Sequence, residues 1–135
     1  MVNPDIQGKR YPRTRPYIVG LEKLREFSAA TFGNTADGFV VPPTFPIAIQ
    51  EHSLSLVIAD PEAGLDFSRV VHGEQRFIYE RQLVPGDELT SELEVASVKS
   101  LGGNHMVTFN TEIFDKQDNL VCTAISTLVV RGEDA

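Results

Sequence analysis

The sequence predicts an α+β domain in which helices pack on one face of an antiparallel sheet. Three observations predict it: apolar residues at helical spacing before residue 31, a second helical segment that is apolar nearly all round, and alternating segments after residue 70. Its 135 residues match one domain, residues 1–135, because domains usually hold roughly 100–200 residues. No repeat or long linker divides the chain.

The first third of the chain predicts a short strand and a helix. The segment 13–19 can form a strand only at an edge or a bulge, because Pro12 and Pro16 cannot donate to a β-ladder. From residue 20 to about residue 31, apolar residues recur at helical spacing. The pair Gly33-Asn34 then ends this helix.

The segment from Phe45 to about Ala59 predicts a buried helix. Pro46 falls in its first turn, where the missing N–H costs no hydrogen bond, and Thr44 can cap the helix. Only Glu51 is ionised, and apolar side chains occupy most of the circumference. We therefore expect this helix to be buried on most sides, against the concave face of a curled sheet.

Four strands are predicted after residue 70, as an antiparallel meander. They cover residues 71–83, 89–99, 105–114 and 120–130. In the first strand, regular alternation places His72 and Glu74 on one face and Gln75 and Phe77 on the other. The last strand is apolar on both faces, which is typical of a strand covered on each side.

Charge and cysteine content exclude several classes of function. The chain holds 19 acidic and 12 basic residues, so we expect no nucleic acid as partner. Its one cysteine, Cys122, can form neither an internal disulfide nor a clustered-cysteine metal site, which fits a reducing cytoplasm. No apolar run approaches the roughly 18–20 residues of a membrane span. We expect a cytoplasmic protein with no membrane span, no metal and no cofactor.

The N-terminal stretch differs in charge from the rest of the chain. Residues 1–25 hold six basic residues against two acidic ones, whereas residues 26–135 hold six against seventeen. Such a stretch can contact a phosphate-bearing ligand or an acidic carrier protein. A charge run this short is more often a solvated surface.

The three histidines are the only side chains suited to acid–base chemistry at neutral pH. His105 opens a strand beside a turn and is expected to be exposed. His52 lies in the apolar helix, where a structural role is more common than a catalytic one. His72 precedes Gly73 and Glu74, a combination that suits either a ligand contact or a structural pair. The sequence contains no phosphate loop, zinc motif or nucleophile elbow.

Several features together carry a resemblance to a known family. They are Val41-Pro42-Pro43-Thr44-Phe45, Val70-Val71-His72-Gly73-Glu74-Gln75, a strand that contains Phe77 and Tyr79, and Arg81-x-Leu83-x-Pro85-Gly86-Asp87-x-Leu89. With them the sequence resembles the MaoC-like dehydratases over residues 13–131, and more narrowly the N-terminal, non-catalytic subunit type of (3R)-hydroxyacyl-carrier-protein dehydratases. The resemblance implies a hot-dog fold, in which a curved antiparallel sheet wraps around a long buried helix, and a dimer joined edge to edge.

The resemblance also implies a reaction, the reversible hydration of a trans-2-enoyl thioester to a (3R)-hydroxyacyl thioester. The family uses an aspartate and a histidine from a Gly-Asp-x-Asn-Pro-x-His segment. At the matching place this chain reads Phe32-Gly33-Asn34-Thr35-Ala36-Asp37-Gly38, without a histidine. Hydration then lacks its general base, which is worth typically ~10²–10⁴-fold in rate. We therefore expect no catalytic residue in this chain and a substrate-binding, non-catalytic role.

The expected substrate contacts form two groups. Thr44 and Phe45 come first, because backbone N–H groups at the start of a helix can hold a thioester or phosphate oxygen. His72, Gly73 and Glu74 come second. The ligand is expected to be an acyl thioester of coenzyme A or acyl carrier protein, and the protein partner either a second copy or a catalytic hot-dog subunit.

Two alternatives stay open at this point. The chain can be a homodimeric acyl-thioester or lipid binding protein without catalysis. It can also be a hot-dog thioesterase that uses the carboxylate of Glu74 or Asp37.

Overall fold

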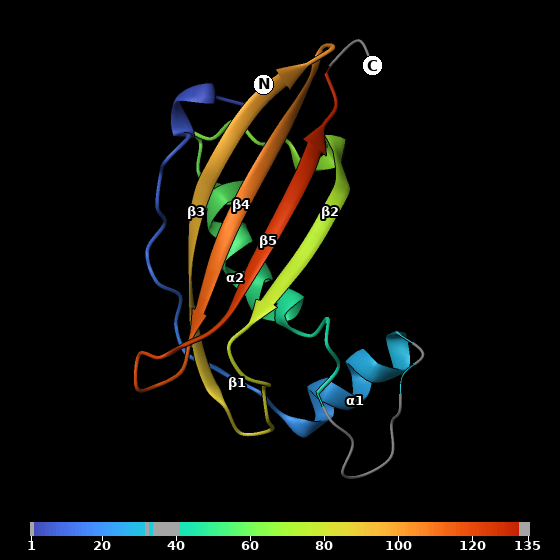
Figure 1. The fold of residues 1–135 in the computed structure, drawn as a ribbon. Coiled ribbons are helices and arrows are strands. Elements are labelled where there is room, and N and C mark those ends of the chain that lie inside the picture. The colour runs from blue at the N-terminus through green and yellow to red at the C-terminus, as the bar shows by residue number, and fades with distance from the viewer. Residues whose placement is uncertain (1, 32, 34–40, 133–135) are drawn as a thin grey trace.

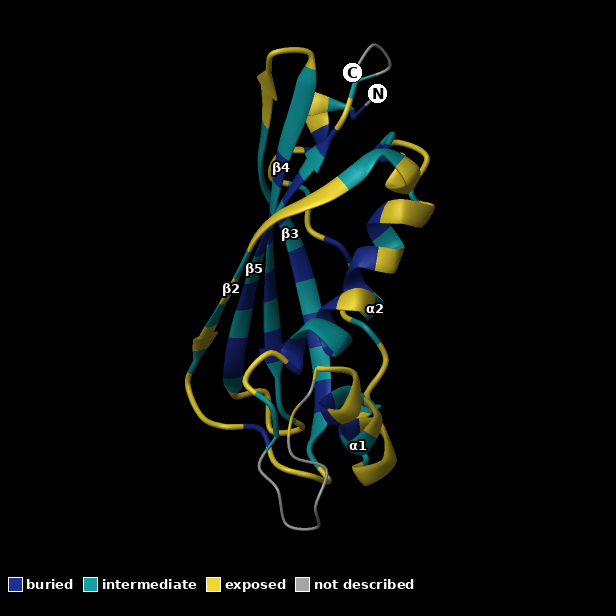
Figure 2. Cartoon of the chain, turned by 90° about the vertical axis from the view of Figure 1, so that its right-hand side faces the viewer, coloured by how far each residue is buried: buried dark blue, intermediate teal, exposed yellow. Residues whose placement is uncertain are grey.

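The structure is a computed structural model that describes residues 2–31, 33 and 41–132. A five-stranded antiparallel sheet curls around α2, and both helices lie on the same side of it (Figures 1 and 2). The helices are α1 (Leu21–Ala30) and α2 (Pro46–Ala59), and the strands are β1 (Tyr17–Ile18), β2 (Val70–Tyr79), β3 (Glu88–Leu101), β4 (Asn104–Phe114) and β5 (Leu120–Val130). The predicted α+β class is confirmed.

Most predicted boundaries agree with the structure, and three details differ. Of the strand predicted over residues 13–19, only β1 (Tyr17–Ile18) forms. Thr44 does not cap α2, because Phe45 occupies the N-cap position and no side chain caps the helix there. The strand predicted to end at residue 83 ends at Tyr79. Beyond it, the N–H groups of Glu80 and Arg81 both donate to the carbonyl of Val121, at 2.8 and 3.4 Å, so the chain leaves the ladder.

The sheet is not a simple meander, because its strand order is β1-β3-β4-β5-β2. The prediction holds for β3, β4 and β5, whereas β2 lies on the far side of β5. The segment between Tyr79 and Glu88 carries the chain from one side of the sheet to the other (Figure 1).

A β-bulge at Gly73 corrects the faces predicted for β2. His72 pairs with Leu128, and Glu74 pairs with Thr127, so Gly73 is an extra residue in the ladder. Leu128 is buried beneath α2, and its neighbour Thr127 lies on the outer face. His72 and Glu74 therefore face opposite sides of the sheet, because one added residue inverts the alternation.

The core between α2 and the sheet consists of two apolar clusters separated by polar side chains. One cluster includes Leu54, Leu93 and Phe109, and the other includes Phe45 and Ile113. Buried polar residues of α2, β3, β4 and β5 lie between the two clusters. We call them the polar belt: Gln50, Ser53, Ser91, Thr111 and Ser126.

The two edges of the sheet differ. Residues 2–16, the N-terminal strap, run along β3, where Tyr11 and Thr14 each donate a backbone hydrogen bond of 2.9 Å to that strand. An isolated bridge between Arg10 and Glu94 belongs to the same pairing. At the other edge, β2 pairs only with β5 among the described residues. One edge is thus covered and the other is open.

Candidate functional site

The start of α2 holds the first group of predicted contacts. Phe45 is fully buried, whereas Thr44 is exposed. The Phe45 N–H donates to the Pro42 carbonyl at 3.0 Å, and Pro46 brings no N–H. Within the described ranges the Thr44 N–H has no hydrogen-bond partner. Among the described residues, the helix start therefore has one backbone N–H without a partner, that of Thr44.

Tyr79 ties the open edge of the sheet to this helix start. Its hydroxyl donates to the carbonyl of Pro43, the residue before Thr44. Burial raises the pKa of Tyr79 to about 12, so the hydroxyl keeps its proton at neutral pH. Its ring lies 6.5 Å from that of Phe77, and both are half-buried on the inner face of β2. Nothing in the sequence predicted this contact between Tyr79 and the helix start.

The second predicted group lies at the opposite end of β2. His72 is exposed, and its Nε2 lies 3.1 Å from the carbonyl oxygen of Glu74. A Cβ on Gly73 would lie 3.3 Å from the Thr127 carbonyl oxygen, so the bulge favours glycine. The seven residue steps from His72 to Tyr79 span roughly 23 Å of extended strand. A single chain therefore does not bring the two predicted groups together.

No histidine forms an acid–base pair with a carboxylate in the part of the chain that the structure describes. His52 is half-buried, with its ring edge-on to Tyr17 at 5.3 Å. His105, expected to be exposed, is half-buried, and its Nδ1 lies 3.4 Å from the Ser100 hydroxyl. Together with His72 these are all the histidines of the sequence. The segment compared with the family's Asp–His motif, including Asp37, lies largely outside the described residues.

Neither carboxylate of the thioesterase alternative is placed beside α2. Glu74 is exposed on the outer face of the sheet, away from the helix. Asp37 lies outside the described residues. Cys122, the one thiol, is buried, and burial raises its pKa to about 11, which leaves it a poor nucleophile at neutral pH.

The basic N-terminal stretch is engaged within the protein. Lys9 contacts Asp60 at 2.6 Å, and two arginines of the strap contact outer-face carboxylates at 2.9 Å. These pairs are Arg10 with Glu94 and Arg13 with Glu92. The charges hold the strap to the sheet, so the geometry favours the surface interpretation over a phosphate site.

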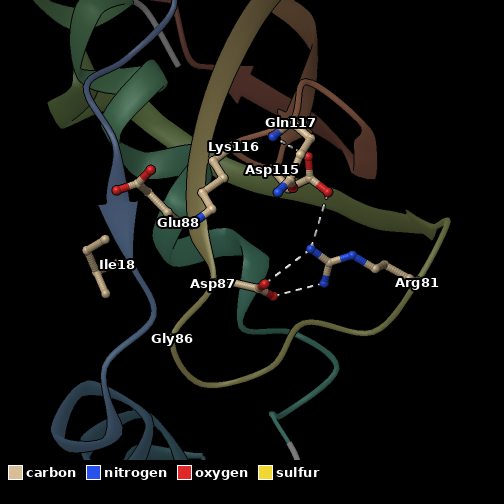
Figure 3. A pocket seen from close by; sticks show the side chains of 8 residues that line it. All are labelled: Ile18, Arg81, Gly86, Asp87, Glu88, Asp115, Lys116 and Gln117. Atoms are coloured by element: carbon tan, nitrogen blue, oxygen red, sulfur yellow. Dashed lines mark hydrogen bonds and ion pairs between the residues drawn. The ribbon is translucent and has the colours of Figure 1, made fainter.

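A small cavity lies where the β2–β3 crossover meets the β4–β5 hairpin (Figure 3). Arg81 donates to both carboxylate oxygens of Asp87, at 2.9 and 3.1 Å, and lies 3.6 Å from Asp115. This arrangement gives the motif from Arg81 to Asp87 a structural role, because the ion pair fixes the two ends of the β2–β3 crossover to each other. The cavity holds about 190 Å³, whereas ligand pockets usually hold roughly 300–1,000 Å³. No predicted contact lines it.

In the described ranges, neither helix has the length and apolar character needed to cross a lipid bilayer. The described His, Cys, Asp and Glu side chains form no group of three that could hold a metal ion.

Comparison with known proteins gives the family. The model of the FAS1-like dehydratase domain region matches residues 6–124. A UPF0336 protein of Leifsonia xyli is 51% identical, over 98% of both chains. A chain of the HadBC (3R-hydroxyacyl-ACP dehydratase) complex of Mycobacterium tuberculosis is 27% identical with a TM-score of 0.74, over 93% of this chain and 97% of that one. A MaoC-like dehydratase is 25% identical with a TM-score of 0.77, over 95% of this chain and 43% of its own length.

These relatives share the curled sheet around a central helix, so the hot-dog fold expected from the sequence is confirmed. The chain therefore belongs to the family of MaoC-like hot-dog dehydratases, which its match to the FAS1-like dehydratase domain model and its likeness to these structures both support.

Proposed function

We propose that this chain is a non-catalytic, substrate-binding subunit of a cytoplasmic hydratase that acts on trans-2-enoyl and (3R)-hydroxyacyl thioesters of coenzyme A or acyl carrier protein. The observation that carries the proposal is that no histidine is placed to act with a carboxylate in hydration. The segment that supplies the family's histidine has none here, and His52, His72 and His105 have no carboxylate partner among the described residues. The fold of a hydratase is present without the pair that performs hydration.

The chemistry defines what each subunit must supply. A base removes a proton from water, the water oxygen bonds to the β-carbon, and negative charge develops on the thioester oxygen before a proton reaches the α-carbon. This chain offers the Thr44 N–H to the thioester oxygen and the Phe77 and Tyr79 rings to the acyl group. The base must come from another chain.

The open edge of the sheet is the place for that other chain. The strap already covers β3, whereas β2 is uncovered and Tyr79 links it to the helix start. A catalytic hot-dog subunit paired along β2 would bring its own residues to Thr44. In such a pair, His72, Gly73 and Glu74 lie at the far end of the same edge and are proposed to contact the remote part of the ligand.

Reconstitution tests the proposal. The chain is mixed with a MaoC-like subunit that carries Asp-x-Asn-Pro-x-His, and hydration of crotonyl-coenzyme A is measured for each protein alone and for the mixture. We expect the mixture to exceed the summed separate rates by at least roughly 10²-fold, the lower end of what one donor to the developing oxyanion contributes. Equal rates with and without the chain would reject the subunit role.

A matched pair of variants tests whether β2 is the edge used. Ile78→Asp places a charge on the open edge, at a side chain that is 46% exposed, and we expect it to abolish the activation. Leu101→Asp makes the same kind of change on the β3–β4 hairpin, at a side chain that is 63% exposed, and is expected to retain it. Full activation by Ile78→Asp would show that the partner binds elsewhere.

A further inference from the structure

The inner face of β2 is apolar beside the helix start and polar further along the strand. Tyr79 and Phe77 are half-buried on this face and pack against one of the two apolar clusters of the core. The next residue on the same face is Gln75, which pairs with the buried Ser126 of β5. The apolar stretch therefore begins beside Thr44, where Tyr79 bonds to the preceding residue, and ends at Gln75.

Gln75 is held in place by a closed cycle of hydrogen bonds. Its Nε2 donates to Oε1 of Gln50 at 3.0 Å, and its Oε1 accepts from the Ser126 hydroxyl. The Gln50 Nε2 donates to the same hydroxyl, so each of the three side chains donates one bond and accepts one. Gln50 and Ser126 are buried, and Gln75 is half-buried. We call these three residues the Gln–Ser network.

The Gln–Ser network also links α2 to the open edge of the sheet. α2 packs on β3, β4 and β5. Among the described residues, the bond from Gln75 to Gln50 is the one hydrogen bond between α2 and β2. Breaking the network to admit an apolar chain would leave buried amide groups without partners, which is unfavourable. The network therefore opposes the passage of an apolar chain between α2 and β2.

We propose that Gln75, held by Gln50 and Ser126, sets the longest acyl chain that this subunit accepts. The four residue steps from Tyr79 to Gln75 cover about 13 Å of strand. An extended chain advances about 1.2 Å per bond, because the three backbone bonds of an extended residue span about 3.5 Å. An acyl chain that starts at Thr44 and follows the two aromatic rings of β2 therefore reaches Gln75 after about ten carbons.

This inference rests on the proposed function, from which it takes the acyl thioester and its place at Thr44. It adds the substrate class, which is acyl groups of up to about ten carbons. Such a chain does not reach the second predicted group, which begins at His72 beyond the network. That group is left to contact a ligand held by the partner subunit.

Binding of saturated acyl thioesters tests the limit, because these thioesters cannot be hydrated. Isothermal titration measures the dissociation constants of hexanoyl-, decanoyl- and tetradecanoyl-coenzyme A with the full chain. Each methylene that becomes fully buried should tighten binding by roughly fourfold. We expect decanoyl to bind at least roughly tenfold more tightly than hexanoyl, and tetradecanoyl to bind within about threefold of decanoyl, since its last four carbons meet no apolar surface.

Gln75→Ala should remove the limit. The smaller side chain leads to the second apolar cluster, which includes Leu128, the next inner-face residue of β5 after Ser126. Tetradecanoyl should then bind at least roughly tenfold more tightly than decanoyl. Gln75→Ser removes the same amide and should shift the limit in the same direction. Arg76→Ala, at an exposed position on the outer face of β2, is the matched control and should keep the original pattern.

Three results would overturn the proposal. They are a tetradecanoyl affinity roughly tenfold or more above that of decanoyl in the original chain, a limit unchanged in folded Gln75→Ala and Gln75→Ser, and no binding of any of the three thioesters. Thermal unfolding verifies that the variants fold. The subunit role has a separate readout, because crotonyl has four carbons and ends before Gln75. Absent activation with crotonyl-coenzyme A would reject that role, whatever the chain-length pattern.

Discussion

Asp60, at the C-terminal end of α2, joins the helix to the N-terminal strap. Its carboxylate accepts hydrogen bonds from Lys9 Nζ at 2.6 Å, the Tyr11 hydroxyl at 2.7 Å and the Glu62 N–H at 2.9 Å. These donors favour the ionised form, and the Lys9 bond is the largest cause that lowers the pKa of Asp60 to about 2. One ionised side chain therefore holds the strap against the end of the buried helix.

The low pKa of Asp60 predicts a pH-dependent contribution to stability. A carboxyl whose pKa is about 2 in the folded chain and 3.8 when unperturbed stabilises the fold above pH 4. That contribution is lost as the pH falls from about 4 toward 2. Asp60→Asn should therefore lower Tm by several degrees at pH 7, and the difference from the original chain should shrink between pH 4 and pH 2. A difference that stays constant with pH would contradict this account.

The polar belt between α2 and the sheet contains buried side chains that differ in whether they have a hydrogen-bond partner. Gln50 donates to the Ser126 hydroxyl and accepts from Gln75 of β2 at 3.0 Å, and Ser126 in turn donates to Gln75. On the neighbouring strand, the hydroxyl of Thr111 is fully buried and has no partner among the described residues. Ser53 and Ser91 also bond to each other, at 2.7 Å, so among the described residues Thr111 is the one belt member without a partner.

Two substitutions in the belt are predicted to act in opposite directions. Ser126→Ala leaves both amides with unmade hydrogen bonds and should lower the free energy of unfolding by about 1–3 kcal/mol. Thr111→Val replaces an unpaired buried hydroxyl with a methyl group of similar size and should raise it by about 1 kcal/mol. Urea denaturation measures both. Destabilisation by Thr111→Val would show that its hydroxyl makes a favourable contact in solution.

The sequence predicts the elements well because their signals are local. The apolar circumference of α2 and the full extent of β5 follow from periodicity within each segment. The position of β2 beside β5 and the bulge at Gly73 do not, since both depend on pairing between segments distant in the chain. A glycine inside a strand pattern was the one local sign of the bulge.

In the candidate site, too, the sequence predicts local features and does not predict contacts between distant residues. The position of Thr44 and Phe45 at the start of α2 could be predicted, because the start of an apolar helix is visible in the sequence. Tyr79 could not, because its contact with Pro43 joins residues 36 positions apart. The single donor at Thr44 was also hidden, since it results from the turn in which Phe45 bonds to Pro42.

At the scale of the whole molecule, the two edges of the sheet differ in whether another chain can pair with them. The strap covers β3 with backbone hydrogen bonds and ion pairs, whereas β2 remains open beside the helix start. Unpaired strand edges invite pairing with another chain. The described chain has one unpartnered backbone N–H at the helix start and no histidine–carboxylate pair, which supports the proposal that it supplies half of a hydratase site.

The hydration rate of crotonyl-coenzyme A with the purified chain alone tests this claim most directly. Our account predicts a rate equal to that of buffer, and the same rate for variants with His52, His72 or His105 changed to alanine. Turnover well above the buffer rate that is lost in one of these variants would contradict it, because that histidine would then act as a general base within this chain.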